Sequence, residues 1–132
     1  MLHSSSKLVV LPVLLASLAA ASDAAAACPG DASGYGTMSG EYFSLGAGTD
    51  IAPLLQGLQD DRCQAPHWGY LLQGELHVSY TDGHEETVRG GDLFHWPPGH
   101  SVRAGADSEV VLFSPQHEHG LVIDHMLEKM QG

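Results

Sequence analysis

Short apolar segments separated by turn residues dominate the chain between residues 62 and 116. Asp82-Gly83 has the composition of a hairpin turn, because glycine accepts the positive φ that such turns require. Strands that recur every 8 to 12 residues or so indicate an antiparallel sandwich or barrel. The pattern therefore predicts an all-β domain with six strands in this part of the chain, at 68–72, 75–81, 85–89, 92–96, 101–104 and 109–114.

The segments on either side are shorter or more ambiguous. Residues 42–45 predict a first strand, and 51–58 predict a short N-terminal helix in which Pro53 is tolerated in the first turn. Glycine-rich residues 28–40 predict a flexible arm ahead of a single domain at 41–132. Residues 119–130 fit either a strand or a C-terminal helix.

Residues 1–27 have the order of a secretory signal peptide. Lys7 is followed by an uncharged stretch and then by small residues up to Ala27. The apolar stretch is shorter than the roughly 20 residues needed to cross a bilayer. We expect export to the periplasm or beyond the cell, the alternative being a buried N-terminal helix. Cys28 follows directly, so a lipid-modified cysteine is a further alternative; without it, no membrane attachment is expected.

The charge balance limits the classes of partner. The chain has a formal net charge of −11 at pH 7, which argues against nucleic acid and anionic membrane surfaces. It suits a protein that handles cations or neutral small molecules. The sequence also lacks a phosphate-binding glycine loop, a Gly-x-Ser-x-Gly elbow and a Cys-x-x-Cys pair, which argues against the enzyme classes that depend on these motifs.

Two segments resemble the paired motifs of the cupin superfamily. They are residues 63–75 (CQAPHWGYLLQGE) and 91–100 (GDLFHWPPGH), and the resemblance extends over about residues 60–116. It implies a small jelly-roll β-barrel with an interior pocket. The variant Cys-x-x-x-His followed by Pro-Pro-Gly-His is similar to a branch of small bacterial cupins.

The chain departs from the commonest cupin pattern of His-x-His, Glu and a later His. With Gly74 aligned, Asp61 and Cys63 stand where the two histidines would be, and His67 stands where the glutamate would be. His100 comes two residues before the place of the final histidine. The resemblance therefore implies the fold and a pocket more than a reaction.

Cys63, His67 and His100 are the candidate metal ligands. Residues four apart on an extended strand share a face, so Cys63 and His67 should point into one pocket. His100 should reach it from a neighbouring strand after the Pro-Pro-Gly turn. A thiolate and neutral imidazoles suit zinc, ferrous iron, nickel or copper. Three protein ligands with an open position suit a catalytic or ligand-exchanging site.

A fourth donor and a pocket wall complete the expected site. Asp61 is the first choice for the fourth donor, with Glu109 or Glu118 behind it. Aromatic and polar side chains near the motifs would enclose a small organic ligand. The residues expected to line the pocket are Trp68, Tyr70, His95, Trp96 and Glu109.

Several alternatives stay open on the sequence. Cys63 could pair with Cys28 in a disulfide, and His67 or His100 could be a hydrogen-bonded structural histidine. His117 and His119 could form a separate metal-binding pair on a strand. The function could be that of a metal-dependent oxygenase, isomerase or lyase, or that of a non-catalytic metal or ligand carrier. A metal-free homodimer paired through an edge strand at 40–45 is the third possibility.

Overall fold

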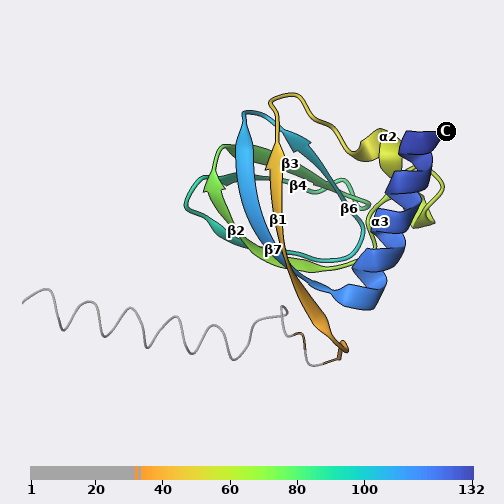
Figure 1. Cartoon of the computed structure of the whole chain (residues 1–132). Helices are drawn as coiled ribbons and strands as arrows, with labels where there is room; N and C mark the ends of the chain where they lie inside the picture. Colours follow the sequence, from red (N-terminus) through yellow and green to blue (C-terminus); the bar gives the residue numbers. More distant parts are fainter. Residues whose placement is uncertain (1–31, 33) are drawn as a thin grey trace, which may run out of the picture. The chain divides into compact units, whose positions relative to one another are not determined.

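The computed structural model describes residue 32 and residues 34–132, and the expected signal peptide at 1–27 and Cys28 lie outside the described residues. Strands and two helices account for most of the described chain (Figure 1). The strands are β1 (Met38–Leu45), β2 (His67–Gln73), β3 (Glu75–Tyr80), β4 (Glu85–Arg89), β5 (Leu93–Trp96), β6 (His100–Ala104) and β7 (Ser108–Pro115). The helices are α2 (Ala52–Leu55) and α3 (Gln116–Gln131), with a 3₁₀ turn at Gln59–Asp61.

The strands form two antiparallel sheets with the orders β1-β7-β2-β5 and β4-β3-β6. The chain passes from one sheet to the other several times, so most neighbours in a sheet are distant in sequence, and only β3 and β4 form a hairpin of consecutive strands. A bridge between Asp50 and Arg103 adds a rudimentary strand beside β6. With it the domain has two four-membered sheets, which is the jelly-roll arrangement. The all-β jelly-roll prediction is confirmed by this strand order.

The corner between β2 and β3 depends on a single glycine. Gly74 connects the two sheets, has φ +99° and lies against Ser108, which a Cβ at this position would overlap. Only glycine combines the positive φ with the missing side chain. This residue is the glycine of the first cupin-like motif, so the motif encodes the corner between the sheets.

The core fills the space between the sheets. Strand β3 alternates buried and half-buried positions, as a strand with one face on a core does. Ten buried side chains from six strands form one cluster: Leu71, Leu76, Val78, Tyr80, Val88, Trp96, Val102, Ala104, Val110 and Leu112.

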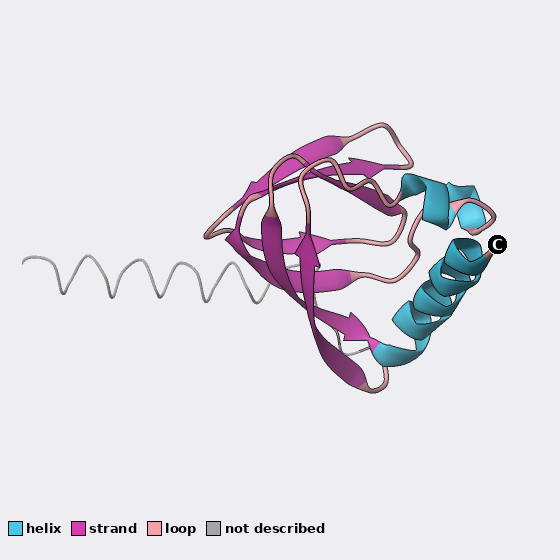
Figure 2. Cartoon of the chain, turned by 45° about the horizontal axis from the view of Figure 1, so that its top comes forward, coloured by secondary structure: helices cyan, strands magenta, loops and turns pink. Residues whose placement is uncertain are grey.

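Both helices lie at the same end of the barrel (Figures 1 and 2). Leu55 of α2 and Val122 of α3 are buried there with Cys63 and Ala65 in a second apolar cluster. The segment at 119–130 is therefore a helix, which settles the alternative that the sequence left open. Among the residues described, no helix has the length and hydropathy required to cross a bilayer.

Strand β1 begins earlier than the sequence indicated. Its ladder with β7 starts at Met38, which pairs with Pro115. Residues 38–40 were expected in the flexible arm because the stretch 28–40 as a whole is glycine-rich and polar. They are ordered as strand because β7 is long enough to offer them backbone partners, which is a tertiary effect.

Candidate metal centre

Backbone hydrogen bonds hold Cys63 beside His100. The Cys63 amide donates to the His100 carbonyl (2.8 Å), and the amides of Gly99 and His100 donate to the Cys63 carbonyl (2.7 and 3.2 Å). Gly99 follows the two prolines and has φ +91°, a conformation that glycine adopts without strain. The backbone of the Pro-Pro-Gly-His turn therefore holds Cys63 and His100 side by side, independently of any contact between their side chains.

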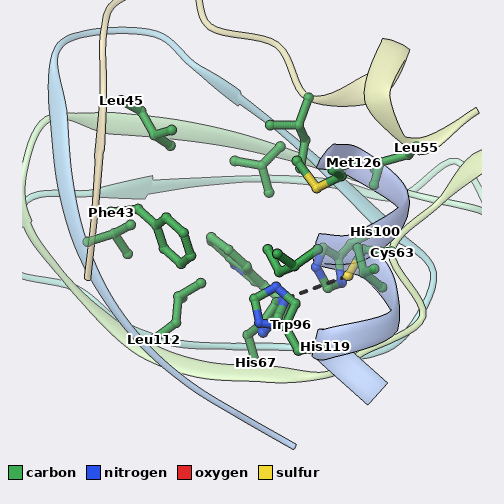
Figure 3. Close-up of a pocket in the computed structure, with 15 residues that line it drawn as sticks. Phe43, Leu45, Leu55, Cys63, His67, Trp96, His100, Leu112, His119 and Met126 are labelled. Carbon is green, nitrogen blue, oxygen red and sulfur yellow. Dashed lines mark hydrogen bonds between the residues drawn. The ribbon is translucent and has the colours of Figure 1, made fainter. Parts of the chain in front are cut away.

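The side chains of Cys63, His67 and His100 meet at this point. The Cys63 Sγ atom lies 3.6 Å from the His67 Nε2 atom. One donor atom from each of the three residues lies within 4.8 Å of the others. All three side chains are buried, with exposed fractions of 2%, 3% and 1%. The structure thus brings together the three residues that the sequence had singled out (Figure 3).

The second nitrogen of each imidazole is already hydrogen-bonded. His100 Nδ1 donates to the Pro97 carbonyl (2.7 Å), so its Nε2 carries a lone pair. His67 Nδ1 lies 2.7 Å from the Ser114 hydroxyl, and the tautomer with the proton on Nδ1 leaves Nε2 free beside Cys63. Metal-binding histidines are typically oriented in this way by a partner on the other nitrogen. The donor set therefore fits a metal ion.

Burial determines the protonation of all three groups. It lowers the pKa of His100 to about 4, and together with nearby His100 and His119 it holds the pKa of His67 well below the ordinary value. Burial also raises the pKa of the Cys63 thiol to about 11. At neutral pH the site therefore offers two neutral imidazoles and a thiol whose proton a metal ion would displace.

His119 is a fourth side chain at this site, and the sequence did not place it there. Its ring centroid is 4.5 Å from that of His67. Its Nδ1 donates to Glu41 Oε1 (2.9 Å) and lies 2.7 Å from Oε2. Because α3 is a helix, residues two apart point in different directions, so His119 is buried and His117 is exposed. The helical spacing of His119, Val122 and Met126 is the signal that could have revealed it.

A cavity of about 120 Å³ adjoins these side chains. Its wall is almost entirely apolar outside the cysteine and the histidines. Strands, the short helix and α3 all contribute to it. The lining residues are Phe43, Leu45, Ile51, Leu55, Cys63, His67, Trp96, His100, Val102, Val110, Leu112, His119, Val122, Ile123 and Met126.

The three residues expected as a fourth donor lie elsewhere. The Asp61 carboxylate is exposed and accepts a hydrogen bond from the Gly57 amide (2.8 Å). It was expected at the site because it aligns with a histidine of the commonest cupin pattern, but the 3₁₀ turn at Gln59–Asp61 interrupts the extended chain. Glu109 accepts a hydrogen bond from the Tyr42 hydroxyl (2.9 Å), away from the cavity. Glu118 does not line the cavity either.

Of the five residues expected in the pocket wall, the structure places Trp96 in the cavity lining and four outside it. His67 faces inward, and side chains alternate along a strand, so Trp68 and Tyr70 face the opposite side of the sheet. His95 alternates with Trp96 in the same way and stacks on Trp68, with ring centroids 5.1 Å apart. The sequence identified one aromatic residue of the cavity wall, Trp96, but not the phase of the alternation along the strands. Glu109 lies outside for the same reason, since its neighbour Val110 faces inward.

Comparisons with known proteins found similarity at the level of structure. No family model matches the sequence, and no curated protein matches it. The chain is similar to a conserved protein of unknown function from Streptococcus pyogenes, with 20% identity, coverage of 61% of this chain and 65% of that one, and a TM-score of 0.47. It is also similar to an RmlC-like cupin from Shewanella frigidimarina, with 20% identity, coverage of 59% and 66%, and a TM-score of 0.42.

A third similar structure is the salicylate 1,2-dioxygenase from Pseudoaminobacter salicylatoxidans, with 19% identity, coverage of 67% of this chain and 24% of that one, and a TM-score of 0.48. The similar structures include cupins. At these identities and TM-scores no activity carries over, and the chemistry has to be argued from the residues of the site.

Proposed function

We propose that this protein binds a divalent metal ion through Cys63 Sγ, His67 Nε2 and His100 Nε2 and presents it to a small organic ligand in the adjoining cavity. The observation that carries the proposal is the convergence of three buried donors within 4.8 Å of one another. Three protein ligands leave a coordination position for exchange, unlike the four of a closed structural site.

The donor chemistry narrows the choice of ion. Sulfur and two imidazole nitrogens suit zinc, ferrous iron, nickel or copper. Magnesium and calcium prefer oxygen donors, and no carboxylate belongs to the cluster of Cys63, His67 and His100 within the described chain. The proposed ion is therefore one of the borderline transition metals.

Cobalt is the probe that tests this site. The purified protein is titrated with Co²⁺, and we expect an absorption band from thiolate-to-metal charge transfer. Cys63→Ser should remove that band, and His67→Ala should weaken binding at least 100-fold. His77→Ala is the matched control, because His77 is a half-buried histidine of β3 that contacts Glu75 (3.0 Å) away from the cavity. Equal cobalt affinity in all four proteins would overturn the proposal.

The pair formed by Glu41 and His119 favours a metal-dependent enzyme over a carrier. A carboxylate only accepts hydrogen bonds, so Glu41 fixes the proton of His119 on Nδ1 and leaves the Nε2 lone pair. His119 lines the cavity, where that nitrogen can accept a proton from a ligand. A bound divalent ion would supply a Lewis acid. Proton removal is a step of isomerisation and lysis, so these reactions are favoured over oxygenation.

A second candidate function is self-association through the outer face of the β1-β7-β2-β5 sheet. Tyr42, Val111, Tyr70 and Leu93 are paired across four strands and form one row on this face. Leu93 is 82% exposed. Monomeric proteins rarely expose a contiguous apolar patch of this kind. Strand β1 also lies at the edge of its sheet, as the sequence-based dimer hypothesis required.

Export is part of the proposal. The support is the order of residues 1–27: a basic start, an uncharged middle and a small-residue end. We expect the protein recovered outside the cytoplasm to begin near Ala27 or Cys28. N-terminal sequencing with intact-mass measurement would detect cleavage, and an acyl mass increment would reveal a lipid on Cys28. Recovery of the uncleaved chain in the cytoplasm alone would contradict export.

A further inference from the structure

The cavity has two chemically different ends. Cys63, His67, His100 and His119 gather on one side, and Phe43, Leu45 and Leu112 lie on the other (Figure 3). Between them the wall consists of aliphatic and aromatic carbon and the indole of Trp96. No lysine or arginine from the described part of the chain lines the cavity.

We infer that the ligand of this cavity is a neutral, largely apolar molecule about the size of one six-membered ring, with a single lone-pair-bearing head. This inference rests on the proposed function for what the head would meet, namely the metal ion. The size and neutral charge of the tail are inferred from the cavity alone. The two parts can therefore be tested separately.

The size follows from the volume. The cavity measures about 120 Å³. An apolar protein cavity of roughly 150 Å³ stays dry and binds benzene. A single ring with a one-atom substituent is thus about the largest rigid molecule that fits without displacement of α3, which supplies Val122, Ile123 and Met126 to the wall.

The charge follows from the lining. A carboxylate or phosphate on the tail would lose its hydration among Phe43, Leu45 and Leu112 with no cation to replace it, which is strongly unfavourable. Glu41 adds a negative charge behind His119, at the polar end. A metal ion could compensate one anionic head but no charge at the opposite end.

The lone-pair-bearing head of the ligand is inferred from a hydrogen-bond donor that has no partner in the described chain. The Nε1–H group of Trp96 is buried, and within the described chain it has no hydrogen-bond partner. Buried donors without a partner are uncommon in folded proteins. Trp96 lines the cavity, so an acceptor atom on the ligand would satisfy this group. Trp68 also has an unpartnered Nε1, but it belongs to the outer face of the sheet.

The test of size and charge uses metal-free protein, prepared with a chelator, and three probes: benzene, phenol and 4-hydroxybenzoate. Phenol and 4-hydroxybenzoate share the head, and the carboxylate of 4-hydroxybenzoate adds both bulk and charge to the tail, so this pair tests the two limits together. We expect benzene and phenol to raise the midpoint of thermal unfolding, as any ligand of the native state does. Calorimetry should show 4-hydroxybenzoate binding more than tenfold more weakly than phenol. Binding of 4-hydroxybenzoate within tenfold of phenol, or no shift with benzene and phenol, would overturn the inference.

Two substitutions locate the binding. Val110→Phe fills the cavity, and its control is Val111→Phe, the next residue of β7, which lies on the outer face. Ile123→Phe on α3 fills the cavity from another side. It is the second cavity-filling variant, to be used if Val110→Phe does not fold. We expect the cavity-filling variants to lose phenol binding and keep cobalt binding, and Val111→Phe to keep both. Phenol binding unchanged in both filled variants would overturn the inference.

The outcomes separate this inference from the proposed function. If cobalt does not bind but phenol does, the metal proposal fails and the ligand class stands. If cobalt binds and phenol and benzene do not, the metal proposal stands and the inference about the ligand fails.

Discussion

His119 in the last helix hydrogen-bonds Glu41 in the first strand, with 2.9 Å between Nδ1 and Oε1. Ser39 donates a further hydrogen bond to the same carboxylate oxygen (2.6 Å). The contact joins α3 to β1 across the open end of the barrel and sets the orientation of a ring that lines the cavity. Closure of the barrel by α3 and the orientation of His119 are therefore coupled.

Glu41→Gln should weaken this coupling. The amide keeps the shape of the side chain but loses the charge that makes the hydrogen bond strong. We expect a loss of about 1 kcal/mol in the free energy of unfolding, because a hydrogen bond to a charged group is roughly twice as strong as a neutral one and the amide oxygen can still accept it. Urea titration measures the loss, and nitrogen NMR of His119 should show that Nδ1 no longer carries the proton exclusively. Glu109→Gln is the control, and an equal loss there would contradict the assignment.

The stability of the metal-free protein should fall on acidification. Burial lowers the pKa of His100 to about 4 and that of His67 well below the ordinary value. Below about pH 6.5 the unfolded chain therefore binds protons that the folded chain does not, so the free energy of unfolding decreases as pH falls toward 4. Each imidazole should contribute on the order of 1 kcal/mol per pH unit in that window.

Urea unfolding between pH 7 and pH 4 measures this slope. His67→Leu should make the slope shallower whatever its effect on the stability at pH 7, because one of the two depressed groups is removed. A slope identical to that of the unsubstituted protein would show that His67 does not contribute to the acid sensitivity.

Metal affinity should rise with pH in the neutral range. The imidazoles are already neutral there, but the Cys63 thiol, whose pKa is about 11, must lose a proton on binding. One proton released per metal ion corresponds to about a tenfold gain in affinity per pH unit. Cobalt competition titrations from pH 6 to pH 9 measure the gain. Cys63→Ala should bind more weakly and with little dependence on pH, and a full tenfold slope in that variant would exclude the thiol as the source of the proton.

The strand boundaries were predictable because they are encoded locally. Asp82-Gly83, Gly90-Gly91 and the Pro-Pro-Gly turn each end a strand through the backbone preferences of their own residues. The convergence of Cys63, His67 and His100 was predictable from the two motifs that carry them. The strand face expected to join the first two is absent, because Cys63 is an isolated bridge beside His100 and β2 begins only at His67. Local rules and a family resemblance sufficed for these features.

The parts that the sequence did not reveal depend on tertiary structure. The side of the sheet on which Trp68 and His95 lie is fixed by the inward direction of His67 and Trp96, which no local pattern specifies. His119 reaches the site because α3 packs over the end of the barrel, and residues 119–130 carried no clear secondary-structure signal. Asp61 was assigned by alignment with a strand that is interrupted in this chain.

The last prediction concerns the outer face of the β1-β7-β2-β5 sheet. Leu93 is 82% exposed in the single chain, and a partner chain on this face would cover it. If the face mediates self-association, Leu93→Lys should therefore place a buried, unpaired charge in the contact and separate the chains. Sedimentation should show the mass of two chains for the unsubstituted protein and of one chain for this variant. Leu121→Lys is the matched control, since Leu121 is an exposed leucine of α3, away from this sheet. A single-chain mass for the unsubstituted protein at every concentration would rule out this second function and leave the metal centre as the remaining proposal.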